Sequence, residues 1–244
     1  SSKLNPVQHV DKLLTISGKG VSGVNEDRAY TLPKRRWDQS YYGIMSDVSP
    51  YTKASGQSMR LAVNPNITDM RGYFNEKESV DVKDSEIMSI SEALGAFAQR
   101  HDSSPRLAMG MSQFDHLVGT EGSEPALVTY GMDEAIASLD SDFNHKMEDD
   151  GEVIEMNERY VKVRYANLKD DKGNPMEVVF NVNKVERNSA KAKYIINTME
   201  LNPKLNIKVG KKLHKNDTIA YNKEFYKNVD GDIVFKSGPI VYVA

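Results

Sequence analysis

The stretch LNIKVGKKLHKNDTIA, residues 205–220, does most to predict the fold of this chain. It contains a short strand-like run, a glycine turn at Gly210, an apolar residue at Leu213, an Asn-Asp turn and a second strand-like run. The stretch DDGEVIEMN, residues 149–157, likewise combines a turn with a strand. Together the two stretches favour interlocked β-hairpins that form a small β-sandwich.

Further strand-like segments surround these two stretches from about Val118 to the end of the chain. They are PALVTYGMDEAIA, RYVKVRYANL, MEVVFNV and GDIVFKSGPIVYVA, and turn signals such as DDKGNP and VDGD separate several of them. This pattern predicts that residues 118–244 form a β-rich domain.

Residues 1–117 have a mixed character. NPVQHVDKLLTI predicts a short helix, because a proline suits the first helical turn and apolar residues recur at helical spacing. SISEALGAFAQRH predicts a second helix with Ser89 or Ser91 as its N-cap. Ser104 and Pro105 predict the start of a third. The expected fold class is therefore α+β, with a β-rich C-terminal half.

The composition, 39% hydrophobic and 27% charged residues, is ordinary for a folded protein, and the lack of cysteine excludes disulfides and thiolate metal sites. No apolar run is long enough to predict a membrane span. The net charge of −3 hides a segregation, because residues 61–160 carry 21 acidic and 7 basic side chains, whereas both flanking parts are basic. The basic parts could face a polyanion, or the charges could be solvated and scattered by chance.

Candidate chemistry is concentrated in LPKRRWDQSYYG, residues 32–43, where three consecutive basic residues stand beside Trp37, Tyr41 and Tyr42. Such a pattern is typical of single-stranded nucleic-acid binding, since cations meet phosphates and flat rings meet bases. A surface loop held by a buried Trp37 explains the pattern equally well. The chain has no phosphate-binding glycine loop, no nucleophile-elbow motif and no metal-ligand spacing of its five histidines. A self-contained enzyme and a metal site are therefore not expected.

The predicted hairpins are similar in shape to those of lipoyl or biotinyl carriers. A carrier needs a lysine at the tip of its tight turn, usually beside Met or Ala, and this sequence does not supply one convincingly. A non-catalytic β-sandwich carrier or binding module stays open as an alternative function.

Eight segments resemble, in order, the β subunit of multisubunit DNA-dependent RNA polymerases. They are NPVQHVDKLLTISGKGVSG, VNEDRAY, SYYGIMSDVSPYTKASGQSMRLAV, ISEALGAFAQRHDSSPRLAMGMSQFDHLV, SEPALVTYGMD, DGEVIEMNERYVKVRY, VGKKLHKNDTIA and GDIVFKSGPIVYVA. Each match is weak alone, and their common order makes coincidence unlikely. The resemblance implies a fork- and rifamycin-region-like α/β segment over residues 1–117 and a β-rich barrel and sandwich-hybrid segment over residues 118–244.

The sequence also departs from the family pattern. The family's ETPEGPN is VSPYTKA here, with only Pro50 kept, and paired arginines of the fork helix are replaced by Leu14 and Thr15. These changes predict poor rifamycin binding. A further family arginine is replaced by Asp115. Because the chain covers only part of the family's catalytic region, it resembles one piece of a split β subunit, as in large phages that encode their own RNA polymerase.

The resemblance also implies site residues. Arg106 aligns with the arginine that contacts the triphosphate of the incoming nucleotide, and a planar, permanently charged guanidinium suits phosphate oxygens. Met109 and Ser112 would follow on the face nearest the substrate or template, and Arg28 would touch downstream DNA. Looser candidates for nucleic-acid contact are Lys19, Arg35 and Arg36. The alternatives are an Arg106 paired with nearby acids, a Met109 in the core, and solvated charges at the other basic positions.

The implied function is that of a DNA-directed RNA polymerase subunit, inactive alone, that contributes to the active-site wall and the fork. The implied partners are the remaining β parts, β′-like subunits, DNA template, RNA and nucleoside triphosphates. Mg²⁺ would be held by the β′-like partner and not by this chain. The expected location is the cytoplasm, which is the host's if a phage encodes the protein, and a place in the virion is also open.

Overall fold

The computed structural model describes residues 4–19, 31–49, 55–69, 71, 82–97, 110, 112–139, 141–182, 185–188, 195–199, 201–204 and 206–243. The chain divides into two units. The first unit comprises Ser1–Pro6, Val118–Leu127 and Asp133–Ala244, and the second comprises Val7–Leu117 and Val128–Met132. The assignment of residues 1–117 and 118–244 to two polymerase segments stays a prediction.

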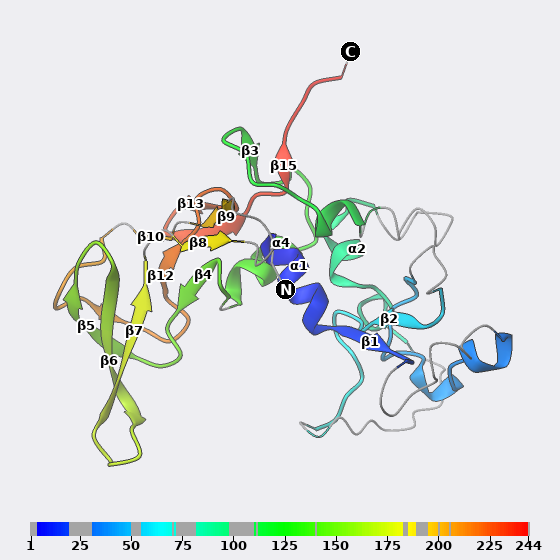
Figure 1. The fold of residues 1–244 in the computed structure, drawn as a ribbon, viewed down its shortest axis with the longest axis horizontal. Helices are drawn as coiled ribbons and strands as arrows, with labels where there is room; N and C mark the ends of the chain where they lie inside the picture. Colours follow the sequence, from blue (N-terminus) through cyan, green and yellow to red (C-terminus); the bar gives the residue numbers. More distant parts are fainter. Residues whose placement is uncertain are drawn as a thin grey trace. The chain divides into compact units, whose positions relative to one another are not determined.

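The described residues form few helices and several small antiparallel sheets (Figure 1), which confirms the α+β fold class. In chain order the elements are α1 (Pro6–Leu13), β1 (Thr15–Ser17), the 3-10 helices η2 (Leu32–Arg35) and η3 (Gln39–Tyr41), β2 (Ser58–Arg60), η4 (Asp84–Glu86), α2 (Ile90–Leu94), β3 (Ser123–Glu124), α4 (Met132–Ser138), β4 (Asn144–Lys146), β5 (Gly151–Met156), β6 (Tyr160–Lys169), β7 (Pro175–Asn181), β8 (Val185–Asn188), β9 (Ile195–Met199), β10 (Asn202–Pro203), β11 (Lys212–Leu213), β12 (Thr218–Tyr221), β13 (Tyr226–Val229), β14 (Asp232–Phe235) and β15 (Gly238–Pro239).

In the second unit, α1 confirms the first predicted helix. It begins at Pro6, where the missing backbone N–H costs nothing, and it buries Val7 and Val10 on one face. The chain then turns into β1, which pairs antiparallel with β2. Beyond β2, Ala62 N donates to the carbonyl of Ile44, so this strand edge also anchors the buried segment around Ile44.

The second predicted helix is present but short. Ser89 is its N-cap: the hydroxyl accepts from the backbone N–H of Glu92, while the Glu92 carboxylate accepts from the backbone N–H of Ser89. The helix, α2, ends at Leu94, because Gly95 is extended and Phe97 adopts a left-handed conformation with φ 61°. The third predicted helix start lies outside the described residues.

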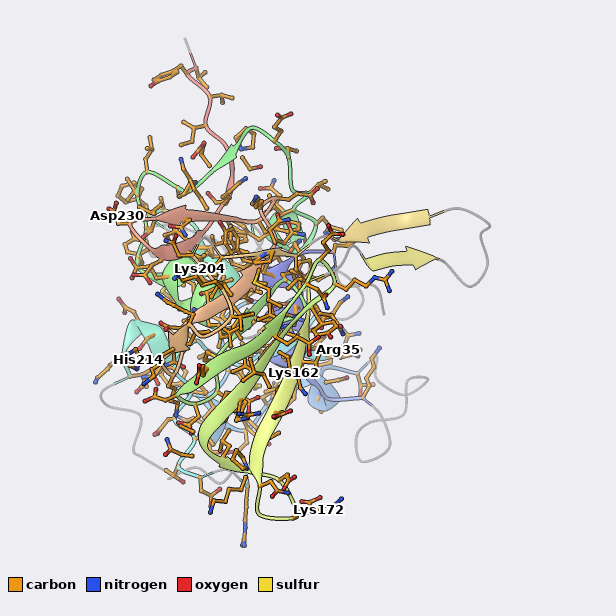
Figure 2. All side chains as sticks on the ribbon, turned by 90° about the vertical axis from the view of Figure 1, so that its left-hand side faces the viewer. Arg35, Lys162, Lys172, Lys204, His214 and Asp230 are labelled. Atoms are coloured by element: carbon orange, nitrogen blue, oxygen red, sulfur yellow. The ribbon has the colours of Figure 1, made fainter. Side chains whose placement is uncertain are left out.

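In the first unit, β11-β5-β6-β7 form a four-stranded antiparallel sheet. The strands β5, β6 and β7 lie side by side as a long meander in Figure 1. Figure 2 shows Lys172 at the tip of the β6–β7 hairpin, where Asp170 accepts from the backbone N–H groups of Lys172 and Asn174. These bonds form the turn that the DDKGNP signal predicts.

A second sheet, β10-β12-β4, shares a buried core with the first one. The core takes Val153 from β5, Val161 and Val163 from β6, Leu213 from β11 and Ile219 from β12. Alternation along each strand sends these side chains to one face. The described residues do not show the expected barrel and sandwich-hybrid arrangement of a polymerase.

The stretch that predicts the fold behaves differently in its two halves. As predicted, β12 is a strand, and β11 pairs with β5 of the other stretch. The strand-like run before Gly210 is not a strand where it is described: Asn206 is left-handed with φ 72°, and Ile207 is buried in the core. Gly210 N instead donates to the carbonyl of Val153, which fixes this segment as a turn beside β5.

One predicted strand segment is wrong. The end of PALVTYGMDEAIA forms the helix α4, with Asp133 and Glu134 in its first turn and Ile136 and Ala137 buried. Acidic residues favour a helix N-terminus, and the two alanines favour helix over strand. None of the helices in the described ranges has the length and apolar character needed to cross a membrane.

Candidate functional site

The predicted site residues fall into two groups. Arg28, Arg106 and Met109 lie outside the described residues, so their roles stay predictions. Ser112 is exposed and lies among the helical residues 112–115. Its backbone carbonyl accepts from the backbone N–H of His116 and contacts the ring Nδ1 of the same residue at 2.7 Å.

The three other candidates belong to the second unit. Lys19 is half-buried, and its backbone N–H donates to the Ser17 hydroxyl. The guanidinium of Arg35 donates to the carbonyl of Ser55 at 3.2 Å, which ties η2 to a segment twenty residues further on. Arg36 is exposed and follows η2 in extended conformation. Arg35 therefore has a structural contact in addition to any role that it has in binding.

The aromatic residues of the same segment are ordered by specific contacts. Trp37 Nε1 donates to the carbonyl of Gly56 at 2.8 Å, and the Trp37 and Tyr41 rings meet edge to face with centroids 5.3 Å apart. Asp38 caps η3, because its carboxylate accepts from the backbone N–H and the hydroxyl of Ser40. These bonds hold the pKa of Asp38 below its usual value.

These residues border a cleft of about 570 Å³, which is hereafter called the aromatic cleft. Its lining residues are Trp37, Asp38, Gln39, Tyr41, Tyr42, Met45, Ser46, Asp47, Met59 and Ile87. The walls are mostly apolar, as in most ligand sites. Ser46 is only 2% exposed, and its hydroxyl has no hydrogen-bond partner among the residues that the structure describes.

An acidic pair lies at the edge of the aromatic cleft. Asp47 lines the cleft and shares a hydrogen bond with the buried Glu92. Burial, and secondarily the neighbouring Asp47 carboxylate, raises the pKa of Glu92 to about 7. The Ser89 hydrogen bonds oppose this rise without cancelling it. Near neutral pH, Glu92 therefore keeps a proton for part of the time.

A second carboxyl pair, Asp11 and Asp115, lies beside Arg60. Asp11 of α1 accepts from Arg60 Nε of β2 at 2.5 Å, and Asp115 shares a hydrogen bond with Asp11. Burial raises the pKa of both acids, and the Asp11 charge adds to the rise of Asp115, which reaches about 6. Arg60 opposes the rise at both sites. The cluster ties the helical turn 112–115 to α1 and β2.

Sequence reasoning missed both carboxyl pairs. Asp11, Arg60 and Asp115 are far apart in the chain, so no motif or spacing marks them. The sequence predicts the aromatic residues of the cleft as binding candidates, because they lie beside the basic residues of the segment 32–43. Ser46 and Asp47 carry no such local sequence signal. Within the described ranges, no group of three or more His, Asp or Glu side chains could hold a metal ion.

Comparison of the sequence with known protein families and with curated proteins finds no match.

Proposed function

We propose that this chain is one part of the β subunit of a multisubunit DNA-directed RNA polymerase, of the split type that large phages encode. The observation that carries the proposal is the common order of eight segments that resemble the family along residues 5–244. In this proposal the chain contributes to the active-site wall and the fork, and residues 118–244 form the barrel and sandwich-hybrid part.

Arg106 has the central chemical role in this proposal. The RNA 3′-hydroxyl attacks the α-phosphorus of a nucleoside triphosphate, a new phosphodiester bond forms, and pyrophosphate leaves as the α–β bond breaks. A guanidinium on the triphosphate positions it and stabilises the charge that develops on the leaving pyrophosphate. Two Mg²⁺ ions, held by aspartates of a β′-like partner, supply the remaining electrostatic stabilisation.

Uncovered apolar side chains support a role within a larger assembly. In the first unit Val118, Leu127, Val241, Tyr242 and Val243 are each more than two-thirds exposed, and Tyr242 is fully exposed. Large exposed apolar side chains are often covered by a partner when they gather in one patch. We expect these side chains to be covered by the other parts of β or by β′-like chains.

Substitution of Arg106 tests the proposal in the assembled polymerase. We expect Arg106→Ala to raise the nucleotide KM or lower kcat by roughly ten- to a hundred-fold, because a charged hydrogen bond contributes about 1.5–3 kcal/mol. The measurement is single-nucleotide extension on a DNA template with Mg²⁺. Arg159→Ala is the matched control, since Arg159 is an exposed arginine between β5 and β6. Equal extension kinetics in the two variants contradict the role of Arg106.

A non-catalytic carrier or binding module is the second candidate. The shared core of the two sheets in the first unit favours it, because a self-contained core is what a stand-alone β-module needs. This candidate predicts a chain that purifies without polymerase subunits.

In the primary proposal the chain works in the cytoplasm, which is the host's if a phage encodes the protein, and a place in the virion is also open.

A further inference from the structure

The aromatic cleft has the walls of a binding site for a flat or apolar group. Trp37, Tyr41 and Tyr42 line it together with Met45 and Met59, so rings and thioethers form most of its surface. Tyr42 is 57% exposed although it borders the cleft, and no described aromatic ring packs on its face. The faces of tyrosine and tryptophan rings carry negative electrostatic potential, which attracts cations.

The charged residues that line the aromatic cleft within the described part of the chain have one sign. Asp38 and Asp47 line it, and Glu92 shares a hydrogen bond with Asp47. No lysine or arginine is among the lining residues that the structure describes. The neighbouring Arg35 and Arg36 do not neutralise these carboxylates. Arg35 donates to the Ser55 carbonyl, and Arg36 is exposed and is not among the lining residues. A phosphate would meet carboxylates in this cleft, whereas a cation would be attracted to them.

We propose that the aromatic cleft binds a guanidinium group on an apolar stem, as in an arginine side chain. A guanidinium is planar and stacks on aromatic faces, and its five N–H donors can bond to the lining carboxylates of Asp38 and Asp47. The apolar stem would contact Met45, Met59 and Ile87, which line the same cleft. The group can belong to a peptide or to a free small amine. This site is separate from the triphosphate contact proposed for Arg106.

The test uses the fluorescence of Trp37, which is the chain's single tryptophan and lies in the cleft wall. The 244-residue chain is titrated with N-acetylarginine amide, a peptide-like probe, and with agmatine, a free amine. N-acetylcitrulline amide is the matched control, because it has nearly the same shape and no charge. We expect a saturable change with a guanidinium probe and at least ten-fold weaker binding of the citrulline probe. The guanidinium probe that binds more tightly indicates whether the natural ligand is a peptide or a free small amine.

Variants of the cleft connect the signal to its residues. Asp47→Asn removes the lining carboxylate and is expected to weaken binding about ten-fold, whereas Asp232→Asn, an exposed aspartate in the other unit, is expected to leave it unchanged. Tyr42→Leu keeps an apolar side chain but removes the aromatic ring. Because Tyr42 is exposed, this substitution should not disturb the fold. We expect this variant to weaken binding several-fold. Circular dichroism confirms that each variant is folded.

Several outcomes overturn the proposal. These are no saturable response to either guanidinium probe, equal binding of the citrulline probe, or unchanged binding in both Asp47→Asn and Tyr42→Leu. A saturable response to a short oligothymidylate with none to the guanidinium probes would instead assign the cleft to single-stranded nucleic acid.

Discussion

Two carboxyl groups in the second unit, those of the buried Glu92 and the half-buried Asp115, keep their protons at higher pH than a free carboxyl group does. Burial raises the pKa of Glu92 to about 7 and that of Asp115 to about 6, and a neighbouring carboxylate adds to each rise. An unfolded chain loses these protons near pH 4. Between pH 4 and about pH 7 the folded state therefore binds more protons than the unfolded state, and stability falls as pH rises.

Substitution of Glu92 tests this pH dependence. Glu92→Gln keeps a side chain that can accept from the Ser89 N–H, because glutamine also completes a capping box, but it removes the ionisable group. We expect it to stabilise the protein by roughly 3 kcal/mol at pH 8 and by little at pH 4.5, since one pKa unit corresponds to about 1.4 kcal/mol and the pKa of Glu92 is raised from 4.5 to about 7. Urea unfolding at the two pH values measures the difference.

Glu158→Gln, at an exposed position in the β5–β6 turn, is the matched control for Glu92→Gln and should change stability little at either pH. A Glu92→Gln variant whose effect is the same at pH 4.5 and pH 8 contradicts the raised pKa.

At the scale of elements, the β5–β6 hairpin depends on a close backbone approach at Gly151. A Cβ at this position would lie 2.6 Å from the carbonyl oxygen of Arg164, which is backbone and cannot move aside cheaply. We expect Gly151→Ala to destabilise the first unit by about 1–3 kcal/mol, the usual cost of overpacking. Gly122→Ala is the control, because nothing lies within 4 Å of a Cβ there.

Thermal unfolding followed by circular dichroism compares the two glycine variants. A Gly151→Ala variant as stable as Gly122→Ala would show that β5 and β6 are not packed at this distance.

Predictability from sequence differs between these elements for physical reasons. The strands β5, β6 and β7 were predictable because their segments are rich in strand-favouring residues and turn signals separate them. The helix α4 was missed because its seven residues adjoin a strand-like run, and short segments show no clear period. The turn before Gly210 was missed because Ile207 is apolar without being in a strand; its burial comes from the tertiary core.

The site was less predictable than the fold. The basic and aromatic residues of the segment 32–43 predict Trp37 and Tyr41 as binding candidates. In the structure both residues line the aromatic cleft, and their rings contact each other. The carboxyl pairs were not predictable, because Asp47 meets Glu92 and Asp11 meets Asp115 only after folding brings distant segments together. The role proposed for Arg106 rests on the family resemblance, because local chemistry alone shows only that a guanidinium suits phosphate oxygens.

At the scale of the whole molecule, exposed apolar side chains in the first unit favour an assembly with other chains. The proposed function requires such an assembly, because in that proposal the Mg²⁺-binding aspartates would belong to a β′-like partner. A stand-alone module requires none. The composition of the complex that the chain forms therefore separates the two functions.

The most direct test is native mass measurement of the complex that co-purifies with the tagged chain from the cells in which it is naturally made. We predict a defined assembly that contains the remaining β parts and β′-like chains and that incorporates ribonucleotides on a DNA template. Recovery of the chain as a monomer, without any polymerase subunit, would contradict the proposed function.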